Sequence, residues 1–132
     1  MSLVLFISVK LVIRSGVLDG ILQAAARHYP REFFCLLGGS LEGDSIRVDE
    51  IVYIPFQNSE HSVVFDPYSI PVNGRVVGSA HSHPFPSPPS LPDVAAFPRT
   101  GWGHLIVFPP FDRCSARAYD SSGREIPLVI ID

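Results

Sequence analysis

The spacing of apolar residues near the start of the chain is that of an amphipathic helix. Between Ser15 and Tyr29, apolar side chains recur every three or four positions, as they do along one buried face of an α-helix. These positions are Val17, Leu18, Ile21, Leu22 and Ala25. Pro30 cannot continue a helix, so a helix is expected from Ser15 to Tyr29.

Runs of β-branched and aromatic residues predict strands on both sides of this helix. Lys10–Arg14 precedes it, and Glu32–Gly39 follows it as an apolar strand closed by Gly38-Gly39. Gly43-Asp44 predicts a turn that leads into Ile46–Ile54 as the hairpin partner. The other expected strands are Arg75–Ala80, His104–Phe108, Ser115–Tyr119 and Ile126–Ile131.

Prolines mark two shorter helical segments. Asp66-Pro67 predicts a helical turn or a helix start, and a short helix is expected from Asp93 to Phe97, where Pro98 stops it. Strands mixed with two or three helices predict an α/β or α+β sheet flanked by helices. The chain shows no internal repeat and no long linker, so residues 1–132 are expected to form one domain with its own core.

The composition is that of a compact folded chain. Hydrophobic residues make up 46% of it and charged residues 17%. Its 10 basic and 13 acidic residues give a net charge of −3, with no basic run. Because phosphate backbones are bound mainly by clustered Lys and Arg, nucleic acid is not an expected partner.

Apolar stretches and cysteines indicate the cellular compartment of the protein. No stretch approaches the roughly 20 apolar residues that span a bilayer, so no membrane partner is expected. Leu3–Ile7 is apolar, but no Lys or Arg precedes it, which argues against a secretory signal and favours a cytoplasmic protein. Cys35 and Cys114 are too few for a disulfide scaffold, and the apolar run around Cys35 favours a buried, unreactive thiol.

Two histidines follow one of the expected strands. His81 and His83 are two residues apart, so on an extended strand their side chains point to the same side, where one metal ion could bind both. Pro84 places them at the carboxyl end of the strand, because it cannot continue a central strand. Five of the nine residues in Pro84–Pro92 are proline, and this stiff loop could bring Asp93 back as a third ligand. Two nitrogens and one oxygen, with a fourth position for water, form a ligand set of catalytic zinc.

The same residues also have simpler interpretations. Ser90-x-x-Asp93 is a capping box, in which Ser90 caps a short helix and Asp93 lies at the positive end of its dipole. A lone His-x-His on a strand is often incidental. The two motifs together favour a metal site, and a helix start can fix both a carboxylate and a hydroxyl that face a cation. The other histidines, His28, His61 and His104, are expected to be structural or exposed.

Hydrolysis at such a site also needs a base. The base accepts a proton from water and returns it to the leaving amine. Glu32 stands out among the acidic residues, because it lies at the start of an apolar strand, where a charge is otherwise unfavourable. Glu32 is therefore the candidate general base.

Taken together, the motifs resemble those of the JAMM (MPN-plus) metalloprotease domains. The segments that carry the likeness are Pro30-x-Glu32, Cys35-Leu36-Leu37-x-Gly39, Asn58, Phe65-Asp66-Pro67, Gly78, His81-Ser82-His83-Pro84 and Ser90-x-x-Asp93. They extend over essentially the whole chain from Lys10, and the signal is specific only in combination. The chain looks most similar to small stand-alone prokaryotic members, including archaeal proteins that act on ubiquitin-like modifiers. The resemblance implies an MPN-type, cytidine-deaminase-like fold, with a mixed β-sheet flanked by helices.

The resemblance also implies the roles of the site residues. His81, His83 and Asp93 would hold one zinc ion per chain, with a water as fourth ligand. Glu32 would be the general base that later protonates the departing amine, and Ser90 would help to stabilise the oxyanion. The reaction would be hydrolysis of an amide or isopeptide bond without an acyl-enzyme. The loop between His83 and Asp93 is one residue shorter than is usual in the family, which concerns loop shape and substrate fit more than metal binding.

Three classes of function follow from the resemblance. The first is a zinc isopeptidase or peptidase whose substrate is a ubiquitin-like β-grasp protein with a Gly-Gly tail. The second is a related hydrolase that frees an amino acid or small molecule from a sulfur-carrier protein. The third is a non-catalytic MPN scaffold, which the loss of a ligand would have marked; none is lost. The residues leave the natural substrate and the oligomeric state open.

Overall fold

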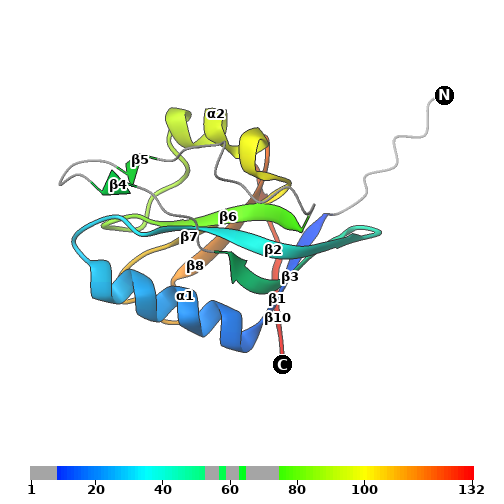
Figure 1. Ribbon diagram of the computed structural model, residues 1–132, viewed down its shortest axis with the longest axis horizontal. Coiled ribbons are helices and arrows are strands. Elements are labelled where there is room, and N and C mark those ends of the chain that lie inside the picture. Colours follow the sequence, from blue (N-terminus) through cyan, green and yellow to red (C-terminus); the bar gives the residue numbers. More distant parts are fainter. Residues whose placement is uncertain (1–8, 53–56, 59–62, 65–74) are drawn as a thin grey trace.

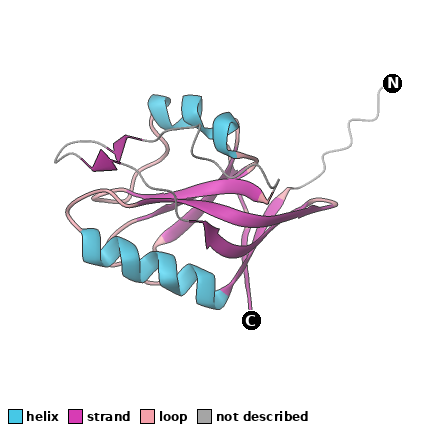
Figure 2. Cartoon of the chain, viewed as in Figure 1, coloured by secondary structure: helices cyan, strands magenta, loops and turns pink. Residues whose placement is uncertain are grey.

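The fold is a curved β-sheet with one helix on each side (Figure 1). The computed structural model describes residues 9–52, 57–58, 63–64 and 75–132. The elements are β1 (Lys10–Arg14), α1 (Ser15–His28), β2 (Phe34–Glu42), β3 (Ser45–Val52), β4 (Gln57–Asn58), β5 (Val63–Val64), β6 (Val76–Ser82), α2 (Leu91–Thr100), β7 (Gly103–Val107), β8 (Ala116–Asp120), β9 (Glu125–Ile126) and β10 (Leu128–Ile131). Figure 2 shows how the strands separate the two helices.

Eight of the strands form one mixed sheet, in the order β10-β1-β3-β2-β6-β7-β8-β9, and β4 and β5 form a separate pair. β1 is parallel to both of its neighbours, and β6 is parallel to β7. The remaining pairs are antiparallel. The expected mixed sheet flanked by helices is therefore confirmed.

The last two strands join opposite edges of this sheet. β9 and β10 lie at the two ends of the strand order, although only Pro127 separates them in the chain. Two residues of chain span at most about 7 Å, so the two edges approach each other and the sheet curls towards a barrel. The Pro127 carbonyl accepts a hydrogen bond from Leu11 N at 2.9 Å. The expectation of one strand over Ile126–Ile131 is wrong, because proline has no N–H for the ladder and the chain changes edges here.

Helix α1 forms where the apolar spacing predicts it, one residue shorter than expected. Its buried residues are Leu18, Ile21, Leu22 and Ala25. They pack on a core formed by the strands, which includes Leu11, Ile13, Leu37, Val48, Ala80 and Leu105. Each large apolar side chain fully buried there contributes roughly 1.5–3 kcal/mol to folding. Arg27 and His28 in the last turn suit the negative end of the helix dipole.

The glycine pair in β2 does not end the strand, contrary to expectation. β2 continues through Gly38 and Gly39, and its register with both neighbours shifts there. A Cβ atom on Gly39 would lie 1.7 Å from the carbonyl oxygen of Arg47 on β3. The pair therefore marks a close approach of two strands rather than a strand end. The expected turn at Gly43-Asp44 is present, with Gly43 at a φ of 60°.

Helix α2 is longer than the expected helix over Asp93–Phe97. It passes through Pro98, which removes one backbone hydrogen bond. Phe97 and Thr100, on either side of this proline, are both buried and hold the last turn of the helix in place. Packing against the rest of the fold therefore outweighs the local effect of the proline.

Some expectations lie outside the described residues. They concern Asp66-Pro67, His61 and the end of the strand expected over Ile46–Ile54. In the part of the chain that the structure describes, no helix is long and apolar enough to cross a membrane.

Candidate metal centre

Strand β6 brings both histidines to its carboxyl end, as the sequence predicts. His81 pairs with Phe34 of β2 on one side and with Ile106 of β7 on the other. His83 follows the last residue of the strand, and its N–H donates to the Val107 carbonyl at 2.9 Å. Neighbouring strands therefore hold both backbones, and the two side chains are only 12% and 11% exposed.

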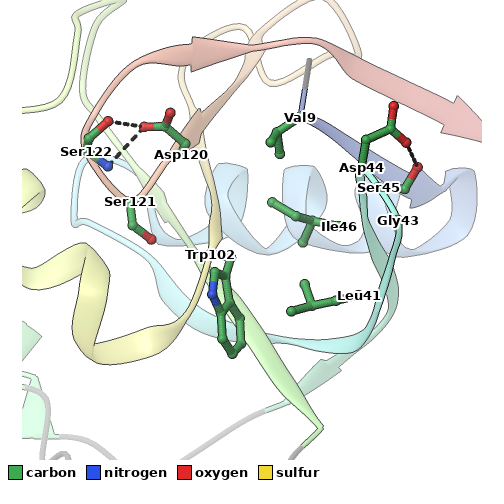
Figure 3. Close-up of a pocket in the computed structure, with 10 residues that line it drawn as sticks. All are labelled: Val9, Leu41, Gly43, Asp44, Ser45, Ile46, Trp102, Asp120, Ser121 and Ser122. Carbon is green, nitrogen blue, oxygen red and sulfur yellow. Dashed lines mark hydrogen bonds between the residues drawn. The ribbon is translucent and has the colours of Figure 1, made fainter. Parts of the chain in front are cut away.

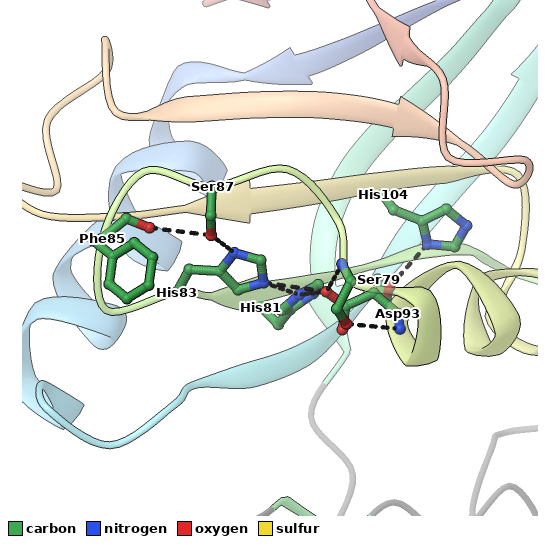
Figure 4. A network of polar contacts seen from close by, with 8 residues as sticks. Ser79, His81, His83, Phe85, Ser87, Asp93 and His104 are labelled. Carbon is green, nitrogen blue, oxygen red and sulfur yellow. Dashed lines mark hydrogen bonds and ion pairs between the residues drawn. The ribbon is translucent and has the colours of Figure 1, made fainter.

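The side chains of His81, His83 and Asp93 converge on one point (Figure 4). His81 Nε2 lies 3.1 Å from His83 Nε2, and Asp93 Oδ2 lies 3.3 Å from the first nitrogen and 3.2 Å from the second. Donor atoms roughly 2.0–2.1 Å from a tetrahedral zinc stand about 3.3 Å apart. The edges of this triangle therefore match three ligands of one zinc ion. In the described segments it is the one group of His, Cys, Asp and Glu side chains whose donor atoms converge in this way.

Asp93 comes from the first turn of α2, where the expected capping box is present. The Asp93 N–H donates to the Ser90 hydroxyl at 3.1 Å, and the Ser90 N–H donates to Asp93 Oδ2 at 2.9 Å. The same oxygen faces the two histidines. Partial burial raises the pKa of this carboxyl, but hydrogen bonds from His81 and His83, together with the Ser90 N–H, hold the pKa far below its usual range. One carboxylate thus serves both the helix cap and the triangle.

Ser87 contacts the other ring nitrogen of His83, a contact that no pattern in the sequence predicts. Its hydroxyl oxygen lies 2.6 Å from His83 Nδ1 and 3.4 Å from the Phe85 carbonyl oxygen (Figure 4). The residue belongs to the proline loop between β6 and α2. A single serine in a loop forms no periodic pattern. The one signal in the sequence for this contact is a hydroxyl residue four positions after a candidate ligand.

Glu32 lies two residues before β2 and outside the group of donor atoms. Phe33 N donates to Ser82 Oγ at 2.8 Å, and Ser82 N donates to the Phe33 carbonyl at 3.0 Å. Glu32 and His83 lie just beyond the paired residues, and the register continued by one more residue would set them opposite each other. Directly opposite residues point to the same side of a sheet, so the continued register predicts Glu32 on the side of the histidines. Glu32 is exposed to solvent.

The other histidines and cysteines described here are not part of the triangle. His104 has no exposed surface, and its ring nitrogens lie 2.8 Å from Ser79 Oγ and 3.3 Å from Ser121 Oγ. Burial lowers the pKa of His104 to about 4. His28 contacts a carbonyl of its own helix. Cys35 is buried, as expected, and burial raises the pKa of its thiol to about 12.

A separate cavity of about 350 Å³ lies at the other end of the sheet (Figure 3). The turn between β2 and β3, the turn after β8 and Trp102 line it. Leu41 and Trp102, two of its apolar residues, are about half exposed. None of the residues predicted for the site lines this cavity, so it is distinct from the metal centre.

Comparisons with known proteins agree with this geometry. Residues 14–121 match the family described as prokaryotic homologs of the JAB domain. A Haloferax volcanii protein described as a probable metalloprotease is 32% identical over 134 residues, which cover 91% of this chain and 79% of the relative. The crystal structure of a JAB1/MPN domain protein from Archaeoglobus fulgidus is 36% identical, with a TM-score of 0.70, covering 91% of this chain and 98% of the other. A structure described as JAMM, a metalloprotease-like zinc site in the proteasome and signalosome, is 33% identical, with a TM-score of 0.71, covering 92% and 98%.

The matched region contains every residue predicted for the site. It runs from the end of β1 to the turn after β8, and so includes β6, the proline loop and α2. The resemblance to JAMM domains is thereby confirmed, and the donor set fits the zinc of such a site. This chain belongs to the prokaryotic homologues of the JAB domain, within the JAB1/MPN family of metalloprotease-like zinc proteins.

Proposed function

We propose that this protein is a zinc-dependent isopeptidase or peptidase that hydrolyses an amide bond at the C-terminus of a ubiquitin-like modifier protein. The observation that carries the proposal is the triangle of His81, His83 and Asp93, with the spacing of three ligands around one tetrahedral ion. Three protein ligands and one open position are typical of catalytic zinc, whereas structural zinc has four protein ligands. The relatives described as a probable metalloprotease and as a JAMM zinc site support a protein substrate.

Two residues, Glu32 and Ser90, divide the remaining chemistry. Zinc bound at the triangle supplies Lewis acidity, which polarises a carbonyl and makes water more acidic. Glu32, two residues before β2, accepts a proton from the attacking water and returns it to the departing amine. The Ser90 hydroxyl oxygen accepts a hydrogen bond from the Asp93 N–H, and this bond leaves the hydroxyl hydrogen of Ser90 available. That hydrogen stabilises the oxyanion, a contact whose loss elsewhere costs roughly 3–4 kcal/mol.

Exposed apolar side chains beside the triangle support a macromolecular substrate. Phe85, two residues after His83, is 63% exposed, and Leu91, directly after Ser90, is 87% exposed. Contiguous apolar surface left in solvent can mark a binding surface, and these two side chains are available to form part of one. A substrate tail that ends in Gly-Gly has no side chains to keep its backbone away from the metal centre.

Two substrates test the proposal. One is a β-grasp modifier whose Gly-Gly tail is joined to a lysine side chain through an isopeptide bond, and the other is the same protein carrying a single amino acid at its C-terminus. We expect the zinc-loaded protein to cleave the isopeptide. Cleavage of the amino-acid adduct alone would instead favour a hydrolase that acts on a carrier protein, and cleavage of neither would indicate a scaffold.

Replacing Glu32 by glutamine separates metal binding from chemistry. Glu32→Gln keeps the shape of the side chain but removes the base, so we expect the rate of hydrolysis to fall roughly 10²–10⁴-fold while zinc is retained. Glu42→Gln, at the far end of β2, is the matched control and should leave the rate unchanged. Steady-state hydrolysis and elemental analysis of both variants provide the measurement. Near-normal turnover in Glu32→Gln would mean that another residue is the base.

A further inference from the structure

The hydroxyl of Ser87 lies where it can fix the proton of a metal ligand. His83 directs Nε2 at the triangle and Nδ1 at Ser87 Oγ, which is 2.6 Å away (Figure 4). A neutral imidazole carries one proton, on either nitrogen. To bind a metal through Nε2, His83 must therefore carry its proton on Nδ1, and that N–H needs an acceptor.

The contacts of Ser87 favour the accepting role. Its hydroxyl has one hydrogen, and the Phe85 carbonyl oxygen, 3.4 Å away, is an acceptor that cannot donate in return. When the hydroxyl hydrogen points to that carbonyl, a lone pair of Ser87 Oγ faces His83 Nδ1. The opposite arrangement, with Ser87 donating to Nδ1, would place the imidazole hydrogen on Nε2, inside the triangle.

The chain around Ser87 restricts where the hydroxyl can go. Pro86 precedes it and Pro88 and Pro89 follow it, and each proline ring fixes its own φ near −65°. Ser87 itself is partly buried. Little conformational freedom is lost when the hydroxyl is held against the ring, so the contact is preorganised.

We propose that Ser87 is a positioning residue for the metal centre, which accepts a hydrogen bond from His83 Nδ1–H and so fixes the tautomer and ring orientation that present Nε2 to zinc. Such outer partners of metal-bound histidines are common, and their loss typically weakens metal binding 10–100-fold. The inference rests on the zinc site of the proposed function, but not on the identity of the substrate.

Zinc affinity is the first test. In competition with a chromophoric chelator, we expect Ser87→Ala to bind zinc about 10–100-fold more weakly than the wild type. Ser87→Thr keeps the hydroxyl and should restore the affinity to within about threefold of the wild type, which a mere packing defect would not explain. Ser40→Ala is the control, since it removes a hydroxyl that bonds Glu42 at the far end of β2.

Nuclear magnetic resonance of the zinc-loaded protein gives the second readout. The Nδ1–H of His83 should be visible and protected from exchange in the wild type and in Ser87→Thr, and lost in Ser87→Ala. Wild-type zinc affinity in Ser87→Ala, or equal weakening in both variants, would overturn the role of Ser87. A wild type that binds zinc but cleaves neither test substrate would overturn the proposed function alone, because the Ser87 comparison would still be measurable.

Discussion

His81 and His104 lie on neighbouring strands and face the same side of the sheet, yet their surroundings are opposite. His104 of β7 pairs with Ser79, which lies two residues before His81 on β6. The ring of Phe97, from α2, stacks on His104 with the ring centroids 4.1 Å apart, and lies 6.4 Å from the His81 ring. One histidine adjoins two other metal-ligand atoms, whereas the other is enclosed by serine hydroxyls.

The partners of His104 use both of its ring nitrogens. The Ser121 hydroxyl donates to the Gly101 carbonyl, so it accepts from His104 Nε2–H, while Ser79 donates to Nδ1. The neutral ring is therefore satisfied without a charge, and burial keeps it neutral by lowering its pKa to about 4. A ring in this state has no lone pair to offer a metal.

The histidine pair has the reverse arrangement. His81 Nε2, His83 Nε2 and Asp93 Oδ2 lie within 3.3 Å of one another, and acceptors this close repel unless a proton or a cation lies among them. Burial does not explain the difference, because the His81 side chain is itself only 12% exposed. The comparison teaches that the neighbouring side chains decide the role of each histidine. Hydroxyls of a strand and a turn surround the structural His104, whereas the Asp93 carboxylate at the start of α2 completes a set of metal ligands with His81.

The largest predicted effect is the pH dependence that His104 gives to the free energy of unfolding. In the unfolded chain this histidine is protonated below about pH 6.5, whereas in the fold its pKa is about 4. Between these values the unfolded state binds the extra proton, so the stability contributed by the neutral ring is complete above about pH 6.5 and falls as the pH drops towards 4. At about 1.4 kcal/mol per pH unit, the total loss is roughly 3 kcal/mol.

His104→Asn removes this titration and provides the measurement. The free energy of unfolding of zinc-free wild type and variant would be compared by urea denaturation near pH 7 and near pH 4.5. Both proteins keep His81, His83 and Asp93, so the difference between them isolates His104. The wild type should lose roughly 2–3 kcal/mol more than the variant. Parallel losses would mean that His104 is not held neutral by the fold.

A somewhat smaller effect is expected from lengthening the proline loop. One glycine inserted between Pro88 and Pro89 loosens the segment that positions Ser90 and Asp93. The hydroxyls that bond His104 lie outside this segment. A displacement near 1 Å at a reacting centre can cost on the order of 100-fold in rate. We expect zinc to be retained, the rate constant for hydrolysis to fall by that order, and the pH dependence due to His104 to stay the same. Unchanged or higher activity would show that the stiffness of the loop does not position the site.

The parts of the fold that the sequence predicts are those whose signals are local. β1 has its expected bounds and α1 differs by one residue, because the apolar spacing and Pro30 lie within or next to these segments. The metal triangle was predictable for the same reason. Strand alternation sets the directions of His81 and His83, and the capping box fixes Asp93 at the start of a helix.

The remaining features depend on contacts between segments far apart in the chain. Ile126–Ile131 is divided because its second half pairs with β1, and the approach of Arg47 explains why Gly39 lies within a strand. The expectation that Glu32 lies opposite His83 depends on the pairing of β2 with β6, which a single sequence does not specify. Ser87 could not be predicted because the path of a loop, rather than a periodic pattern, brings its hydroxyl to the imidazole.

The zinc content of the purified protein tests most directly the claim that His81, His83 and Asp93 form one metal centre. Elemental analysis of the wild type, His81→Ala and His104→Asn, after dialysis to remove loosely bound metal, compares a proposed ligand with a structural histidine one strand away. We expect about one zinc per chain in the wild type and in His104→Asn, and less than about one tenth of that in His81→Ala. Stoichiometric zinc in His81→Ala, or a loss of zinc in His104→Asn as large as in His81→Ala, would contradict the account.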